Sequence, residues 1–184
     1  MCKLINKYYM QKVTVIFIST LLLIVTAAFK INKKPTINWL TLTQMQVAYK
    51  KNPKPILIDV YTTWCGWCKV MDKQTYSNEK VVTYINQKYY AVKFDAESKE
   101  SVELNGVKYD YNTQYKINEL GSYLLMGQMS FPSTVFLVSL DAKPAPLAGY
   151  LKPKEIEAPL KYFGEDNYKI SNFPQFAKSF KASW

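Results

Sequence analysis

The two cysteines within residues 64–69 constrain this chain more than any other feature. The segment reads Trp-Cys-Gly-Trp-Cys-Lys; it follows an apolar, strand-like run at residues 56–61 and precedes a helical pattern. If Cys65 sits at the N-terminus of that helix, the free backbone N–H groups and the positive end of the helix dipole favour its thiolate. Cys68 lies one turn further on, where it can close a disulfide with Cys65 or attack a mixed disulfide. The spacing predicts thiol–disulfide exchange.

The ionisation of Cys65 determines how reactive such a pair is. An ordinary thiol with a pKa near 8.5 is only about 3% ionised at pH 7. Cys-X-X-Cys motifs commonly lower that pKa to about 7, and the thiol is then roughly half ionised. We therefore expect an exposed Cys65 sulfur at the start of the helix, with the Cys68 sulfur tucked behind it.

A structural staple or half of a metal site are the two other interpretations of the pair. A disulfide that closes so short a loop stabilises a fold by only about 2 kcal/mol, which is little compared with a long-range bridge. Three cysteines without any histidine supply too few ligands for a zinc site. Redox chemistry is therefore favoured, and we expect neither a metal nor another cofactor.

The residue types that are missing exclude several classes of function. The chain has no histidine, which rules out Ser–His and Cys–His catalysis. It has no arginine either, so bidentate guanidinium contacts to phosphate are unavailable. The formal net charge is +10, but the lysines are scattered and no nucleic-acid motif accompanies them. We expect no nucleic-acid partner.

The first 29 residues have the composition of an export signal. Lys3, Lys7 and Lys12 precede a nearly continuous apolar stretch at residues 13–29. The small residues just before Phe29 would suit a signal peptidase, whereas an uncleaved stretch would attach the protein to a membrane. Residues 1–29 are therefore predicted to be a signal peptide or an N-terminal membrane anchor, and a buried core helix is the third option. Both main readings predict an exported protein, either periplasmic or in the cell envelope.

Residues 35–184 suit one α/β domain, because strand and helix patterns alternate along them. Asn105-Gly106 lies between two short alternating runs, which is a strong hairpin signal. Ser77 is placed to cap a helix. Phe173, Phe176 and Phe180 share one face of a C-terminal helical tail at about 168–184, which is expected to dock on the domain itself; a partner or a membrane surface is the alternative. The predicted strands are 56–61, 90–94, 134–139 and 147–151; the predicted helices are 43–51, 65–73, 117–128 and 154–163; the hairpin covers 102–109.

Three features together resemble the thioredoxin superfamily: Asp59 inside the first core strand, the 64–69 segment, and Phe131-Pro132 just before a strand. The resemblance is strongest to exported bacterial thioredoxin-like proteins. It implies a three-layer α/β fold with a central mixed β-sheet flanked by helices. It also implies an inserted hairpin and helix at about residues 96–129, before a cis-proline at Pro132. That insertion either shapes a surface for a client protein or is a passive decoration.

The resemblance also implies roles for individual residues. Cys65 would attack and Cys68 would resolve the mixed disulfide. Asp59 would assist proton transfer to Cys68, although a polar residue at a strand end is the alternative. Phe131 and Pro132 would receive the backbone of an extended substrate by strand addition.

Trp64 and Trp67 flank Cys65, and each either contacts substrate or packs locally. Trp67 occupies a position that is often proline in thioredoxins, which leaves the reduction potential open. Reduction of client disulfides is favoured over oxidation or isomerisation, with client proteins and a membrane or periplasmic electron donor as partners. The competing interpretation is a non-catalytic thioredoxin-like binding or assembly module with a structural cysteine pair.

Overall fold

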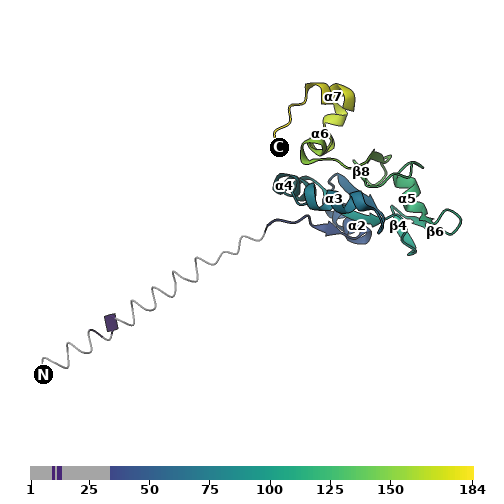
Figure 1. The fold of residues 1–184 in the computed structure, drawn as a ribbon, viewed down its shortest axis with the longest axis horizontal. Helices are drawn as coiled ribbons and strands as arrows, with labels where there is room; N and C mark the ends of the chain where they lie inside the picture. The colour runs from purple at the N-terminus through teal and green to yellow at the C-terminus, as the bar shows by residue number, and fades with distance from the viewer. Residues whose placement is uncertain (1–9, 11, 14–33) are drawn as a thin grey trace. The chain divides into compact units, whose positions relative to one another are not determined.

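The computed structural model describes Met10, Lys12, Val13 and residues 34–184 of the chain (Figure 1). The chain divides into two units, Met1–Lys34 and Pro35–Trp184, and the β-sheet lies within the second. Nearly all of the predicted signal peptide or anchor at residues 1–29 lies outside the described residues. Within the described part of the chain, no helix combines the length and apolar character that a membrane crossing needs.

A five-stranded mixed sheet forms the centre of the domain, in the order β1-β3-β2-β8-β9. The central strand β2 runs parallel to β3 and antiparallel to β8. This arrangement confirms the predicted α/β class with a central mixed sheet flanked by helices. The strands are β1 (Trp39–Leu40), β2 (Ile56–Tyr61), β3 (Tyr90–Asp95), β8 (Ser133–Leu137) and β9 (Ala145–Ala148).

Helices cover both faces of this sheet. Successive side chains of β2 point to opposite faces, so Ile58 joins one buried cluster with Met45 while Leu57 joins a second cluster with Met71. Both faces of β2 therefore carry buried apolar side chains, as the apolar run at residues 56–61 predicted. The helices packed on the first cluster are α2 (Leu42–Lys51) and α5 (Glu119–Leu124); those on the second are α3 (Gly66–Gln74), α4 (Glu79–Lys88) and α6 (Pro153–Gly164).

The insertion predicted at about residues 96–129 is structured. Asn105 and Gly106 both have positive φ angles, +52° and +77°, and they turn the antiparallel hairpin of β4 and β5. A second two-stranded pairing and a short helix follow. The elements are β4 (Val102–Leu104), β5 (Val107–Tyr109), β6 (Tyr111–Asn112), β7 (Ile117–Asn118) and α5 (Glu119–Leu124).

The predicted helix 117–128 is wrong at both ends. Ile117 pairs with Asn112 in β7, and the Asn118 side chain caps α5 by accepting from the N–H of Leu120 at 3.0 Å. At the other end, Met126 and Gly127 have positive φ angles, which end a right-handed helix. Apolar spacing alone did not reveal that the asparagine would start the helix later.

Two other boundaries also differ from the prediction. Asn78, not Ser77, caps α4: its side chain accepts from the N–H groups of Lys80 and Val81, while the Ser77 hydroxyl donates to the carbonyl of Lys73. The strand expected at 147–151 is β9 at Ala145–Ala148, because the backbone of Gly149 leaves the sheet with a φ angle of +96°. Both differences are shifts of one to three residues.

The C-terminal tail docks on its own domain, as predicted. After the 3-10 turn η1 (Asn167–Lys169), α7 (Phe173–Ser179) places Phe173 and Phe176 on the ring of Tyr162, with centroids 5.2 and 5.3 Å apart. The phenol of Tyr162 also donates to the carbonyl of Ser171 at 2.8 Å. Aromatic packing and a partly buried hydrogen bond therefore join α7 and the turn before it to α6.

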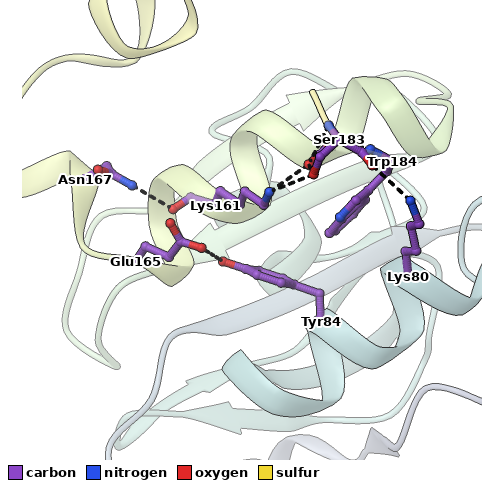
Figure 2. Close-up of polar contacts among 8 residues, drawn as sticks. Lys80, Tyr84, Lys161, Glu165, Asn167, Ser183 and Trp184 are labelled. Carbon is purple, nitrogen blue, oxygen red and sulfur yellow. Dashed lines mark hydrogen bonds and ion pairs between the residues drawn. The ribbon is translucent and has the colours of Figure 1, made fainter. Parts of the chain in front are cut away.

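A fully buried carboxylate, that of Glu157, fastens residues 183–184 to α6. It accepts from Lys161 Nζ at 2.7 Å, from the Ser183 hydroxyl at 2.6 Å and from the Trp184 N–H at 3.0 Å. Figure 2 shows the surrounding contacts, in which Lys80 Nζ donates to the carbonyl of Ser183. Burial by itself raises the pKa of Glu157, but its hydrogen bonds outweigh burial and hold the pKa below the ordinary value.

We expect Glu157→Gln to lower the free energy of unfolding at pH 7 by about 2 kcal/mol, because Lys161 would lose its charge partner inside the protein. A carboxylate with a lowered folded pKa stabilises the fold above its unfolded pKa and loses this effect as pH falls through the folded pKa. Urea unfolding should therefore show the difference shrinking below about pH 4. Glu100→Gln, at an exposed position, is the matched control; an equal loss there would contradict the prediction.

Candidate functional site

The C-terminal end of β2 and the start of β8 bring the predicted site residues together at one end of the strands. The antiparallel register pairs Val60 with Ser133, so the loop that leads to Cys65 lies beside Pro132. The Phe131–Pro132 peptide bond is cis. Contact between the rings of Trp64 and Phe131, with centroids 6.1 Å apart, shows that the two segments meet.

Cys65 and Cys68 form a disulfide across the first turn of α3, with Cα atoms 5.3 Å apart. Cys65 is the N-cap of that helix, and its sulfur accepts from the backbone N–H of Cys68 at 3.1 Å. A free N–H aimed at a sulfur stabilises a negative charge there. The helix start predicted at Cys65 is therefore correct, and it places Cys65 where a thiolate is favoured.

The prediction that Cys65 is the exposed member of the pair is wrong for this disulfide form. The exposed fractions are 5% for Cys65 and 6% for Cys68. The side chains that face solvent at this point are those of Trp64 and Trp67, at 66% and 62% exposed. Both indoles therefore lie on the surface close to Cys65 in the sequence. A partner that reaches the sulfur must pass close to them.

Asp59 lies in the middle of β2, only 2% exposed, and the structure surrounds it with charged groups. Lys93 is its neighbour on β3, with Nζ 3.4 Å from an Asp59 carboxylate oxygen. The same ammonium lies 2.7 Å from both carboxylate oxygens of Asp72 on α3. Burial raises the pKa of Asp59 to about 7; Lys93 lowers it and Asp72 raises it.

The interaction of Lys93 with two carboxylates extends to aromatic rings. Its ammonium lies 5.1 Å from the ring centroid of Tyr61 and 5.5 Å from that of Trp39. These charges and rings are what a half-buried lysine needs in order to remain ionised. Neither Lys93 nor Asp72 was singled out from the sequence. A lysine inside the apolar run of residues 90–94 was the signal that could have revealed the first.

Trp64 is held from two sides. Its indole N–H donates to a carboxylate oxygen of Glu97 at 3.0 Å, and its ring meets Phe131 edge to face. Glu97 lies at the beginning of the insertion, so the insertion contacts the site directly. In the described part of the chain, no group of three or more Cys, Asp or Glu residues is placed to hold a metal ion.

The insertion also contains an open cavity of about 430 Å³, next in sequence to the Phe131-Pro132 segment. Tyr115, Ile117 and Met129 supply much of its apolar lining, and Glu119 supplies a charge. The lining includes neither cysteine nor Asp59. The chemistry therefore belongs to the start of α3.

Comparison with known proteins gives several relatives. An uncharacterized protein of Caenorhabditis elegans is 26% identical over 135 residues, which are 73% of this chain and 15% of that protein. A thioredoxin-like protein of Synechocystis is 32% identical over 77 residues, 42% of this chain and 62% of that protein. The thiol:disulfide interchange protein DsbD of Campylobacter jejuni is 29% identical over 65 residues, 35% of this chain and 11% of that protein. The chain spans less than two thirds of the length of each.

Solved structures show the same fold at lower identity. A thioredoxin from Thermus thermophilus superposes with a TM-score of 0.53 at 14% identity, over 72% of this chain and 93% of that one. A DsbH oxidoreductase superposes with a TM-score of 0.50 at 16% identity, over 71% of this chain and 85% of that one. A family model described as "Thioredox_DsbH: Protein of unknown function, DUF255" matches residues 26–162. Because this match spans most of the chain, the protein belongs to that family, within the thioredoxin superfamily.

Proposed function

We propose that this protein is an exported thiol–disulfide oxidoreductase that reduces disulfides of client proteins through Cys65 and Cys68. The observation that carries the proposal is the Cys65–Cys68 disulfide at the N-cap of α3, with an N–H aimed at the Cys65 sulfur. The thioredoxin-like fold and the family membership support an oxidoreductase of this kind. Export rests on the composition of residues 1–29, and reduction on the thioredoxin-like context of residues 64–69.

The reaction begins with the reduced protein. The Cys65 thiolate attacks one sulfur of the client disulfide, and the other client sulfur leaves as a thiolate that takes up a proton. The Cys68 thiol then loses its proton and attacks the Cys65 sulfur. The second client thiol departs, and the Cys65–Cys68 disulfide of this structure is the product. Two electrons pass to the client, and a dithiol donor must restore the cysteines.

Asp59 is proposed to accept the proton of Cys68 in the second step. A pKa of about 7 lets the carboxylate both bind and release a proton near neutral pH. Lys93 and Asp72 tune this value in opposite directions, since one attracts and the other repels the negative charge. Pro132 and Phe131 are proposed to receive the client backbone, and Trp64 and Trp67 to contact its side chains.

A binding or assembly module is the second candidate, because a specific observation favours it. Both cysteines are nearly buried, while the two neighbouring tryptophans are widely exposed. A surface of this kind can hold a partner without exchange chemistry.

For the reductase function, the proposed electron donor is a membrane or periplasmic dithiol protein, and similarity to a thiol:disulfide interchange protein supports an exchange partner.

We expect the full-length chain with Cys2→Ser to reduce insulin disulfides in the presence of a dithiol donor, and Cys65→Ser in the same background to abolish turnover. Cys68→Ser should instead accumulate a mixed disulfide with insulin, because the resolving thiol is missing. Turbidity and non-reducing electrophoresis measure the two outcomes. Equal activity of the unsubstituted and Cys65→Ser proteins would leave only the binding module.

We expect Asp59→Asn to slow resolution of the mixed disulfide at pH 7 by at least about tenfold, since a positioned base contributes about 10²–10⁴-fold. Asp59 accepts a proton only when ionised, so the rate of the resolution step, in which Cys68 attacks Cys65, should rise through about pH 7 in the unsubstituted protein, and this rise should disappear in the variant. Stopped-flow measurement of the single-turnover rate checks both. An unchanged pH profile would remove Asp59 from the mechanism.

The stabilities of the unsubstituted protein and of Asp59→Asn supply an independent check on the raised pKa of Asp59. Because burial raises the pKa of Asp59 from 3.8 to about 7, the folded oxidised protein keeps a proton that the unfolded chain loses between these values. The contribution of Asp59 to stability therefore falls as pH rises through that window. The free energy of unfolding of Asp59→Asn, relative to that of the unsubstituted protein, should therefore rise by about 2–4 kcal/mol between pH 4 and pH 8. Urea unfolding at each pH measures this difference.

A further inference from the structure

The Trp67 side chain is 62% exposed, yet it contacts another aromatic ring. Its indole stacks on the ring of Tyr150, with centroids 5.5 Å apart and ring planes inclined by 29°. Tyr150 comes from the connection between β9 and α6, far from Trp67 in the sequence. One face of the indole therefore rests on tyrosine, and the exposed area lies on the remainder of the ring.

Tyr150 is itself fixed. Its phenol donates to the side-chain carbonyl of Gln74 at 2.6 Å, near the C-terminal end of α3. The ring also packs against the second buried cluster under the sheet. A tyrosine that is bonded at its tip and packed along its body has few rotamers to choose from. It therefore offers Trp67 a rigid platform.

The residues on either side of Tyr150 join the same platform to the rest of the site. The N–H of Gly149 donates to the carbonyl of Pro132 at 2.8 Å. The carbonyl of Leu151 accepts from the hydroxyl of Thr75, the C-cap of α3. Residues 149–151 thus contact the segment of Pro132 and both ends of α3. The Trp67 side chain, which stacks on Tyr150, therefore keeps its position relative to the disulfide and to Pro132.

We propose that Tyr150 is a positioning residue for Trp67, and that the stacked pair makes the protein prefer disulfides within polypeptides to small soluble disulfides. A polypeptide with an apolar or aromatic side chain beside its half-cystine would contact the outer part of the fixed indole as it approaches the nearly buried sulfurs. A small disulfide lacks that side chain and gains nothing from the pair. The preference rests on the proposed reductase function; the positioning of Trp67 does not.

A double-mutant cycle tests whether Tyr150 acts through Trp67. The measured quantity is the ratio of kcat/KM for insulin to kcat/KM for hydroxyethyl disulfide, in the full-length chain with Cys2→Ser. We expect Tyr150→Leu, which keeps apolar packing but lacks a ring, to lower this ratio at least fivefold. Trp67→Leu should lower it as much, and the double variant no further. Additive losses would show that Tyr150 acts independently, which would overturn the proposal.

A conservative variant and an unrelated tyrosine provide the controls. Tyr150→Phe keeps the stacked ring and loses only the hydrogen bond to Gln74, so it should retain at least half of the original ratio. Tyr168→Leu makes the same change at a tyrosine of η1, which contacts the ring of Tyr162 and not that of Trp67, and should leave the ratio unchanged. A loss in Tyr150→Phe as large as in Tyr150→Leu would contradict a role for the ring.

The indole N–H signal of Trp67 in a ¹⁵N NMR spectrum gives a readout that does not depend on activity. Trp67→Phe identifies the signal by removing it. Tyr150→Leu should shift it, because the ring current of tyrosine is lost, whereas Tyr150→Phe should leave it nearly in place. If the unsubstituted protein reduced neither substrate, the reductase function and the preference would both fall. An unshifted signal in Tyr150→Leu would overturn the positioning of Trp67 even in an active protein.

Discussion

The pairing of β2 with β3 on one side and β8 on the other fixes the relative positions of the site residues. β2 lies in the centre of the sheet, so its residues are buried on both faces. Its register sets Asp59 beside Lys93 and Val60 beside Ser133. Where β2 ends, the chain turns directly into the helix that begins at Cys65. A shift of the register by one residue would reverse the side chains and separate the acid from the lysine.

Within that frame, one ammonium group is shared between two carboxylates. Lys93 is closer to Asp72 than to Asp59, so the buried acid is only partly compensated. An acid in this setting releases its proton reluctantly but can still do so at neutral pH. The arrangement is costly for folding, and such cost is expected where chemistry requires it.

Local patterns predicted most of the fold, because they depend on neighbours in the sequence. The apolar run at 56–61, the Asn105-Gly106 turn and the start of α3 all follow from short-range rules, and the structure confirms them. The late start of α5 and the cap at Asn78 were missed, since a competing side-chain hydrogen bond decides each. The burial of Cys65 was also missed, because exposure depends on how neighbouring side chains arrange themselves in space.

The site was only half predictable for the same reason. Cys65 and Cys68 could be recognised by type and spacing, and Asp59 and Pro132 by the resemblance to the thioredoxin superfamily. Lys93, Asp72 and Tyr150 act through contacts between segments that are distant in sequence, and no single residue pattern marks such contacts. The insertion belongs to both groups: its hairpin was evident, but the hydrogen bond from Trp64 to Glu97 was not.

The root of the insertion is unusually tight. The N–H of Ala96 donates to the carbonyl of Tyr61 at 2.9 Å, its carbonyl accepts from Asn118, and a Cβ added to Gly121 would lie 3.2 Å from its side chain. Two backbone hydrogen bonds and the close approach of Gly121 therefore fix the position of Ala96. A loop further out, such as residues 112–116, can vary in length and composition while the root keeps its position. Evolution can in this way vary the outer face of the molecule and leave the sulfur chemistry untouched.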